Sequence, residues 1–325
     1  MDNKKIVKIV AIVGAIGFIV FAVSSYLLSG SDVRPEPTQS YVDSDGNTHL
    51  KPVKDPSADT ADDDQQSYAR VDYDSKQRAF NDYWQSSTDA FDDWQVAIYD
   101  EQDKLTYQAS SRPQSETKPH TMTLASVTKV GILASYLRTS NDLDTAHQQL
   151  AEKMITKSDN DSAQKLYSEV EKRNPGSLQR TYQDMGAENT TVDPSHWGLT
   201  KSTALDQIKV LTSVFNDSAN NGMSAEQQQY MRGLMQHVTP TQQWGVGQVA
   251  KNAYLKNGWL PDDETATDSS DDTTWTVNSI GHVTKNNRQF DIAVLTHGAE
   301  FDNATQQLST MLKKSLRIVQ GDVTE

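Results

Sequence analysis

The strand-like segments of this chain fall into two groups that a long series of helical patterns separates. Strand-like residues over 94–100 and 104–109 surround the acidic stretch Asp100–Asp103, which is typical of a hairpin. Three further strand-like segments come much later and cover 253–259, 275–283 and 290–296. This order predicts the α+β class, in which one antiparallel sheet is split in sequence by a helical lobe.

Helical patterns fill the interval between the two groups, and a helix flanks the strands at each end. The patterns within the interval cover about 126–139, 145–156, 159–172, 177–185, 202–218 and 224–236. Before the first strand, Phe80, Tyr83 and Trp84 are spaced for one face of a helix over 76–88. A last helix is expected over 303–319. We therefore expect an antiparallel sheet flanked by N- and C-terminal helices, with an inserted helical lobe, in one domain over 76–325.

The N-terminus carries 20 consecutive residues without a charge, over 9–28. That length is enough for a helix to cross a hydrocarbon core of about 30 Å. Lys4, Lys5 and Lys8 precede the run, and the flank that follows it has no lysine. The positive-inside bias therefore predicts a cytoplasmic stub over 1–8, a transmembrane anchor over 9–28 and an extracytoplasmic remainder.

A cleavable signal peptide is the alternative interpretation of the same run. The apolar core of such a peptide is usually shorter, and no A-x-A-like site follows here, although Ser24 and Ser25 leave cleavage open. Both interpretations export the rest of the chain. We expect a single-pass protein of the cell membrane, and no kinase or ATPase chemistry, because there is no ATP outside the cell.

The segment 29–75 is expected to be a disordered acidic linker. From Ser31 to Ser75 it holds 11 acidic and 4 basic residues, and it lacks any sustained apolar period. A small folded domain, the alternative, would need more apolar residues than this stretch has.

Composition excludes several kinds of protein. The chain has 325 residues and no cysteine, so disulfides, thiolate nucleophiles and Cys-ligated zinc are ruled out. The net charge of −14 argues against a nucleic-acid partner. The 7 histidines show no H-x-x-x-H or H-E-x-x-H spacing, so we expect no metal and no cofactor. Neither a G-x-S-x-G elbow nor a phosphate-binding loop is present, and a Ser-His-Asp triad stays open because such residues can meet in space.

What remains is a serine–lysine pair, Ser126 and Lys129, where an extended segment meets a predicted helix. A serine at a helix N-terminus profits from the helix dipole, and its free backbone N–H can donate to an oxyanion. The three-residue spacing places Lys129 on the same helix face, within reach of the hydroxyl. A desolvated lysine with a lowered pKa can then take the serine proton. By itself the pattern is weak, because Ser162 and Lys165 repeat it.

A second element, Ser158-Asp159-Asn160, comes just before the helix predicted to follow it. By average usage this tripeptide is expected by chance in only about a tenth of chains of such length. The alternative interpretation is a helix N-cap, because all three residue types cap well.

A third element, Lys256-Asn257-Gly258, lies inside a predicted strand. Glycine inside a strand marks a close approach of backbone or ligand, and the neighbouring lysine supplies a fixed positive charge. A hairpin turn at Asn-Gly is the alternative, although Trp259 and Leu260 continue the apolar pattern.

The order S-x-x-K, S-D-N, K-x-G resembles the signature set of class A β-lactamases and penicillin-binding proteins, over about 75–320. The resemblance implies that Ser126 attacks a carbonyl and becomes acylated and that Lys129 activates it. It further implies that Ser158 relays a proton to the departing nitrogen and that Asn160 contacts the substrate amide.

The resemblance also implies a substrate-binding strand, formed by Lys256, Asn257, Gly258 and Trp259. Lys256 would help hold a substrate carboxylate and tune Ser158, while the backbone N–H groups of Ser126 and Trp259 would form the oxyanion hole. The implied function is a membrane-anchored serine hydrolase that acts on β-lactams or on D-Ala-D-Ala-type peptides of the cell wall.

The sequence departs from this family at two places. Asn257 stands where the family more often has Thr or Ser, which puts substrate preference in doubt. The family's loop after S-D-N carries a Glu that activates the deacylating water, but over 185–202 the only acids are Glu188 and Asp193, and neither fits that pattern. We therefore expect slow deacylation. The short spacing of Ser126 and Ser158 further predicts a trimmed helical lobe and a more open cleft.

Two alternatives remain. A catalytically impaired module that binds the cell wall or a protein partner would account for both departures, but it gives no reason for a buried lysine. A Ser-Lys peptidase of the signal-peptidase kind would leave Ser158 and Lys256 unexplained.

Overall fold

The computed structural model describes residues 38–42, 48–52, 58–88, 90–112, 119–140, 143–217, 222–262 and 273–322, with side chains from Asp72 onward. The chain divides into two units, Met1–Tyr68 and Ala69–Glu325. The first unit contains an antiparallel hairpin of β1 (Thr38–Val42) and β2 (Thr48–Pro52). The stub and anchor expected over 1–28 lie outside the described residues. Within the described ranges, no helix is both long and apolar enough to span a membrane.

Helix α2 (Ala58–Ser87) begins much earlier than the helix expected over 76–88. Together with β1 and β2, its first half differs from the disordered linker expected over 29–75. The sequence of α2 contains neither Gly nor Pro, and the ion pair between Asp72 and Lys76 (2.8 Å) spans one turn. A helix can therefore continue through a polar stretch that has no apolar period of its own.

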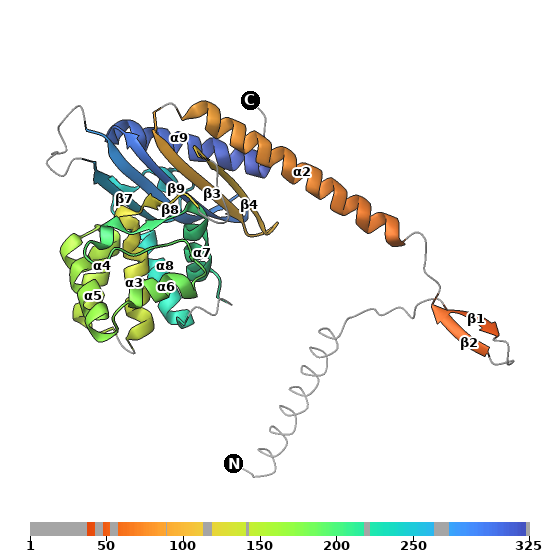
Figure 1. Ribbon diagram of the computed structural model, residues 1–325, viewed down its shortest axis with the longest axis horizontal. Helices are drawn as coiled ribbons and strands as arrows, with labels where there is room; N and C mark the ends of the chain where they lie inside the picture. The colour runs from red at the N-terminus through yellow and green to blue at the C-terminus, as the bar shows by residue number, and fades with distance from the viewer. Residues whose placement is uncertain are drawn as a thin grey trace, which may run out of the picture. The chain divides into compact units, whose positions relative to one another are not determined.

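A five-stranded antiparallel sheet has the order β4-β3-β9-β8-β7 (Figure 1). Its strands are β3 (Asp93–Asp100), β4 (Leu105–Ser110), β7 (Tyr254–Pro261), β8 (Trp275–Lys285) and β9 (Arg288–Ala299). The two strand groups of the sequence thus meet where β3 pairs with β9, and the predicted α+β class is confirmed. Strand β7 forms one edge of this sheet.

The opposite edge, β4, is covered by side chains of α2. Tyr73 donates to the carbonyl of Thr106, and Gln77 both donates to and accepts from the backbone of Gln108. Side chains of α2 thus satisfy backbone groups that an edge strand otherwise exposes.

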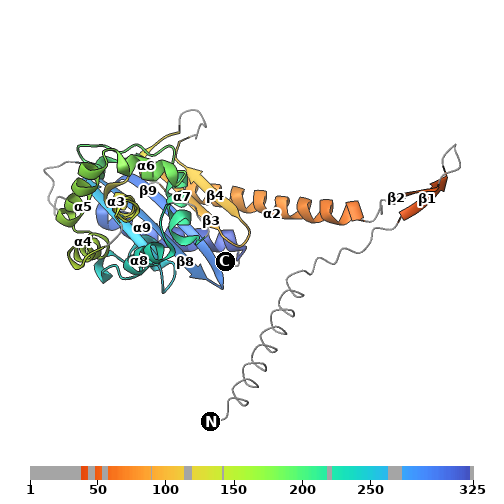
Figure 2. The ribbon, with the colours of Figure 1, turned by 90° about the horizontal axis from the view of Figure 1, so that it is seen from below.

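The helical lobe lies on one face of the sheet, and α9 and the part of α2 from Ala69 onward lie on the other (Figure 1). The lobe consists of α3 (Thr128–Thr139), α4 (Thr145–Thr156), α5 (Asn160–Arg173), α6 (Ser177–Asp184), α7 (Ala204–Phe215) and α8 (Ala225–Gln236). Helix α9 (Phe301–Gln320) follows β9. Seen from below, α3 lies among the other helices of the lobe (Figure 2), which agrees with the burial of all its residues up to Leu137.

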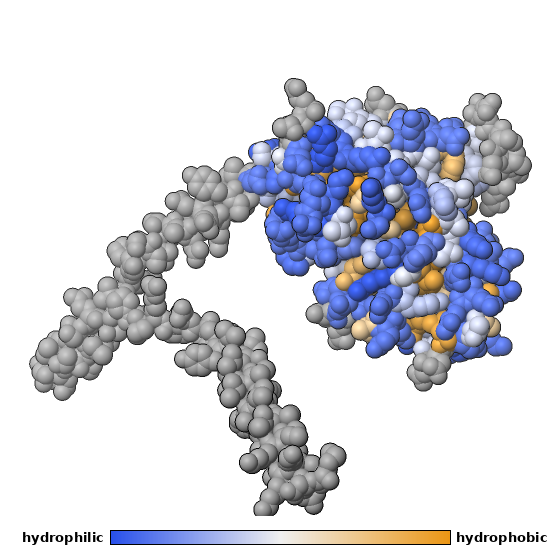
Figure 3. Space-filling model, turned by 180° about the vertical axis from the view of Figure 1, so that it is seen from behind, coloured by the Kyte–Doolittle hydropathy of each residue, from blue (hydrophilic) through white to orange (hydrophobic). Residues whose placement is uncertain are grey.

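The two faces of the sheet have separate apolar cores. Along β3, Ala97 packs into the core of the helical lobe, whereas Val96 and Ile98 pack into the core beneath α2 and α9. This alternation follows the two-residue period of a strand. Figure 3 shows one face of the molecule, largely hydrophilic, with apolar residues in view mainly where the sheet part meets the helical part.

Candidate active site

Ser126 lies in η1 (Ala125–Val127), a short 3₁₀ turn that leads into α3. The preceding residue, Ala125, has a φ of 50°, a conformation that non-glycine residues rarely adopt. The side chain of Asn278, on β8, holds this segment in place by donating to the carbonyls of Thr123 (2.8 Å) and Leu124 (3.1 Å). The strained backbone is thus fixed by a neighbouring strand, and Ser126 itself remains half-buried.

Lys129 is the centre of the candidate site. Its Nζ lies 2.8 Å from Ser126 Oγ, 2.6 Å from the carbonyl oxygen of Ser158, 3.1 Å from Ser158 Oγ and 2.7 Å from Asn160 Oδ1. The side chain is fully buried at the base of α3. Burial lowers the pKa of Lys129 to about 7, against an opposing effect of the Asp159 carboxylate. A large fraction of Lys129 is therefore neutral near neutral pH, as a base for Ser126 must be.

Ser158 lies between α4 and α5 and has a φ of 58°. Its Oγ accepts hydrogen bonds from Lys129 and also from Lys256, whose Nζ lies 2.9 Å away. Asp159 is the N-cap of α5, since its carboxylate accepts from the N–H of Ser162 at 2.8 Å. The tripeptide therefore has two roles: Asp159 caps the helix as the alternative interpretation expected, and Ser158 and Asn160 face Lys129.

Lys256 is fully buried on β7. Besides Ser158 Oγ, its Nζ donates to the carbonyl of Asn257 at 2.7 Å. Burial and, to a lesser degree, the nearby Lys129 lower the pKa of Lys256 well below its usual value. This position suits the tuning of Ser158 that the resemblance implies.

Gly258 lies inside β7 opposite Asn278, so the alternative of a hairpin turn is wrong. A Cβ atom at this glycine would lie 2.7 Å from the carbonyl oxygen of Leu124, 2.7 Å from the amide nitrogen of Val127 and 2.9 Å from that of Ser126. The predicted close approach is confirmed, and the backbone that approaches Gly258 is that of Ser126 and its neighbours.

Asn257 differs from the expectation that its amide contacts substrate. The side chain is fully buried, and its Nδ2 donates to the carbonyls of Gln242 (2.7 Å) and Trp244 (3.2 Å). Alternation along β7 points Asn257 toward these loop residues, on the face opposite to Lys256 and Gly258. In this geometry Asn257 supports the loop rather than a ligand.

Trp259 follows Gly258 and is half-buried. Its ring packs near Trp244 and Phe301, with centroids 6.2 Å apart in both cases. The backbone of Trp259 thus adjoins Gly258 and Ser126, whereas its side chain lies with residues of α9 and of the loop before β7.

The loop over 185–202 places an aromatic ring, not a carboxylate, over Lys129. Trp197, in η2 (Trp197–Leu199), has its ring centroid 5.2 Å from Lys129 Nζ, and its indole N–H donates to Gln164. Glu188 is exposed, and Asp193 accepts from the N–H groups of Ser195 and His196, which lower the pKa of its carboxyl. Sequence reasoning missed Trp197, because no pattern connects it with Lys129.

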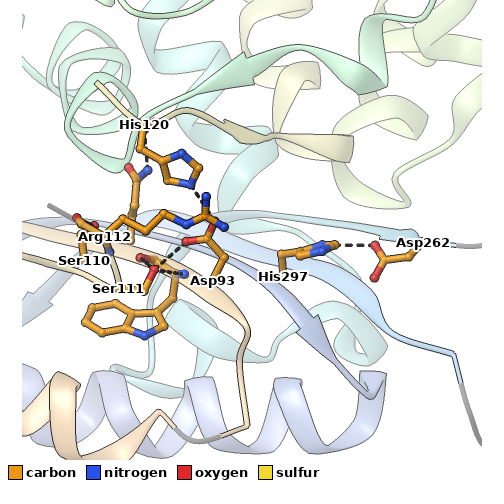
Figure 4. A network of polar contacts seen from close by, with 9 residues as sticks. Asp93, Ser110, Ser111, Arg112, His120, Asp262 and His297 are labelled. Carbon is orange, nitrogen blue, oxygen red and sulfur yellow. Dashed lines mark hydrogen bonds and ion pairs between the residues drawn. The ribbon is translucent and has the colours of Figure 1, made fainter. Parts of the chain in front are cut away.

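A serine, a histidine and an aspartate also meet at the start of β3 (Figure 4). Asp93 is the central member: Ser111 Oγ donates to it at 2.5 Å, His120 Nε2 lies 2.6 Å away, and Arg112 pairs with it at 3.0 Å. In a catalytic triad the histidine must lie between the serine and the acid. Here the acid lies between them, so this network does not form a triad.

Two other clusters carry no catalytic assignment. Ser162 is buried and Lys165 is exposed, so the second S-x-x-K does not form a site-like pair. Glu101, His282 and Asp291 offer ligand atoms within 4.8 Å of one another. His282 Nδ1 lies 2.9 Å from Asp291 Oδ1 and 3.7 Å from Glu101 Oε1, so His282 contacts both carboxylates directly.

Comparison with known proteins agrees with this geometry. The sequence model described as the Beta-lactamase enzyme family matches residues 121–320. A class A β-lactamase from Bacteroides cellulosilyticus is 15% identical, with a TM-score of 0.56 over 74% of this chain and 97% of its own. TLA-1 extended-spectrum β-lactamase is 14% identical, with a TM-score of 0.57 over 75% and 98%.

PBP-A, in a mutant solved as an acyl-enzyme complex with penicillin G, is 14% identical, with a TM-score of 0.54 over 75% of this chain and 96% of its own. A search of curated proteins found no match. The likeness to these solved structures establishes the fold, and the sequence match extends over more than half of the chain. The chain therefore belongs to the β-lactamase enzyme family.

Proposed function

We propose that this protein is a serine hydrolase that β-lactams or D-Ala-D-Ala-type cell-wall peptides acylate at Ser126. The observation that carries the proposal is the contact of 2.8 Å between Ser126 Oγ and the Nζ of a buried lysine whose pKa lies at about 7. A fully buried lysine is costly, and this one lies beside the hydroxyl of a half-buried serine. Such a pair is an activated nucleophile.

In the first step, Ser126 Oγ attacks the carbonyl carbon of the substrate while neutral Lys129 accepts the hydroxyl proton. In the neutral state of Lys129 the 2.8 Å contact runs from the Ser126 hydroxyl to the amine lone pair. The oxyanion of the tetrahedral intermediate accepts from the backbone N–H groups of Ser126 and Trp259. The adjacency of β7 to η1 at Gly258 supports this pairing.

In the second step, the carbon–nitrogen bond breaks and Ser158 gives its hydroxyl proton to the departing nitrogen. Lys129, now an ammonium, returns a proton to Ser158 Oγ across 3.1 Å, which restores both groups. Lys256 donates an N–H to the same oxygen at 2.9 Å, and this hydrogen bond stabilises the charge that develops there. Asn160 holds Lys129 through its Oδ1, and its amide contacts the substrate amide.

Release of the acyl group is proposed to be slow. Within the described part of the chain, the hydrogen bonds of Lys129 go to Ser126, Ser158 and Asn160, and none goes to a carboxylate. Trp197 lies over Lys129, and Asp193 is engaged in its own turn. A base that activates a deacylating water is therefore missing from the contacts of the serine–lysine pair.

We also propose that the domain acts outside the cell, tethered by the uncharged segment over 9–28. The three lysines before this segment support that orientation. Such a placement would bring Ser126 to the cell wall, where its proposed peptide substrates occur.

The test is acylation by a fluorescent penicillin, followed on a denaturing gel for the wild type and for Ser126→Ala. Labelled wild type and unlabelled variant are the expected result. Absence of label on both proteins would refute the proposal. If, in addition, Ser126→Ala bound cell-wall material as tightly as the wild type, a catalytically impaired binding module would be the better description.

A further inference from the structure

A cavity of about 370 Å³ lies on the side of β7 that faces α9. Its lining includes Gln242, Trp244, Trp259, Trp275, Phe301 and Asp302. We call it the aromatic cavity. Four of these residues come from the sheet and the first turn of α9, and the other two come from the loop around η3 (Pro240–Gln242) that precedes β7.

The aromatic rings form steep walls rather than a flat platform. Phe301 is the common neighbour: its ring lies 6.2 Å from that of Trp244 at 86°, and 5.5 Å from that of Trp275 at 58°. Trp244 and Trp259 meet at 64°. Several aromatic rings around one space resemble the aromatic cages that bind ammonium groups.

The only charged group among the described lining residues of the cavity is a carboxylate. Asp302 contributes it, exposed at the start of α9. None of the described lining residues is a lysine, an arginine or a histidine. The charge of the cavity therefore favours a cation over an anion.

The N-terminus of α9 does not offset the preference of the cavity for a cation. The carboxylate of Glu300 already accepts from the N–H groups of Asp302 and Asn303, at 2.9 and 2.8 Å. These two amides of α9 are therefore occupied, and an anion entering the cavity would meet the carboxylate of Asp302 instead of these donors.

The aromatic cavity adjoins each of the three site motifs. Trp259 follows Gly258, which touches the backbone of Ser126. Gln242 donates through Nε2 to the carbonyl of Lys157, the residue before Ser158, at 3.1 Å. Its own carbonyl accepts from Asn257, the neighbour of Lys256, at 2.7 Å. Because β7 is an edge strand of the sheet, a substrate that lies along this edge at Ser126 can extend around the strand to the cavity.

We propose that the aromatic cavity binds an alkylammonium group carried by the substrate. The proposal rests on the proposed function, because it names a chemical feature of the molecule that acylates Ser126. The cavity would then favour substrates with a cationic substituent over uncharged substrates of the same shape. The carboxylate of Asp302 supplies negative charge, and the aromatic rings supply the cage. Gln242 connects the cavity to Lys157, the residue before Ser158, and to Asn257, the residue after Lys256.

Choline and its uncharged isostere 3,3-dimethylbutan-1-ol provide a matched pair of probes for the full-length protein. At constant ionic strength we expect choline to shift the indole ¹H–¹⁵N signals of Trp244, Trp259 and Trp275 and the isostere to leave them nearly unchanged. Asp302→Asn should weaken choline binding roughly fivefold. Glu226→Gln is the matched control, because it also removes an acid from the second position of a helix, away from the cavity, and should bind choline as wild type does.

Equal shifts by choline and its isostere, or unchanged affinity in Asp302→Asn, would overturn the proposal. Shifts caused by a chitin trisaccharide and not by choline would overturn it in favour of a carbohydrate site. The measurement is repeated with Ser126→Ala, which cannot be acylated and should bind choline normally. Failure of acylation and failure of ammonium binding are therefore separate results.

Discussion

Lys129 and Lys256 donate to one and the same atom, the Oγ of Ser158, at 3.1 and 2.9 Å. Both side chains are fully buried, and burial lowers the pKa of each. Two ammonium groups that share one acceptor repel each other, so they titrate as a pair and one proton is lost early. For Lys129 the main cause is burial, which keeps part of the amine beside Ser126 neutral at a pH where an ordinary lysine is charged.

Acylation should depend on pH through Lys129. Its pKa of about 7 means that the neutral amine is scarce at pH 6 and dominant at pH 8. The second-order rate constant for penicillin acylation should therefore rise with pH through about 7 and level off above it. Lys129→Arg stays charged throughout, and we expect it to acylate about 10²–10⁴-fold more slowly at every pH. A wild-type rate that is flat or falls with rising pH would contradict the role of Lys129.

Ser158→Ala removes the acceptor that the two lysines share. The leaving nitrogen then loses its proton donor, so acylation should fall about 10²-fold or more while Ser126 remains in place. Ser168→Ala is the control, an exposed serine on α5 that lies outside the site. The rates come from stopped-flow mixing with a fluorescent penicillin. Equal rates for the two variants would refute the proton relay.

Trp197→Ala should move the pH profile. The ring lies 5.2 Å from Lys129 Nζ, and its loss admits water to a lysine whose pKa is lowered mainly by burial. Hydration favours the charged form, so the pKa of Lys129 should rise and the midpoint of the acylation profile should shift to higher pH. Trp197→Phe retains an aromatic face and should shift the midpoint of the acylation profile less. A midpoint that stays at about 7 in the alanine variant would show that Trp197 does not shield the amine.

Two glycine substitutions test whether β7 packs closely against the backbone of η1: Gly258→Ala on β7, and Gly233→Ala on α8 as the control. In Gly258→Ala the new Cβ would lie 2.7 Å from backbone atoms, which cannot rotate away, so we expect a loss of stability of about 1–3 kcal/mol and impaired acylation. Gly233, on α8, has no atom within 4 Å of such a Cβ, so Gly233→Ala should stabilise by about 0.5–1 kcal/mol. Chemical denaturation measures both, and a neutral Gly258→Ala would contradict the packing of β7 on η1.

The element order, the split sheet and the positions of the three motifs could be predicted because they follow from local periodicity and spacing. Gly258 shows why: a glycine inside a strand already signals close approach. Contacts set by tertiary structure could not be predicted. The orientation of Asn257 depends on a loop that precedes β7, Trp197 reaches Lys129 from a distant segment, and α2 continues to Ala58 without an apolar period.

The most direct test follows the mass of the intact protein after mixing with penicillin G, with the adduct located by peptide mapping. We expect a single acyl adduct on Ser126 that forms within the experiment and persists after excess penicillin is removed, because no carboxylate of the described residues is hydrogen-bonded to Lys129. An adduct on another residue, or none at pH 8, would contradict acylation at Ser126. An adduct on Ser126 that disappears as fast as it forms would contradict slow release.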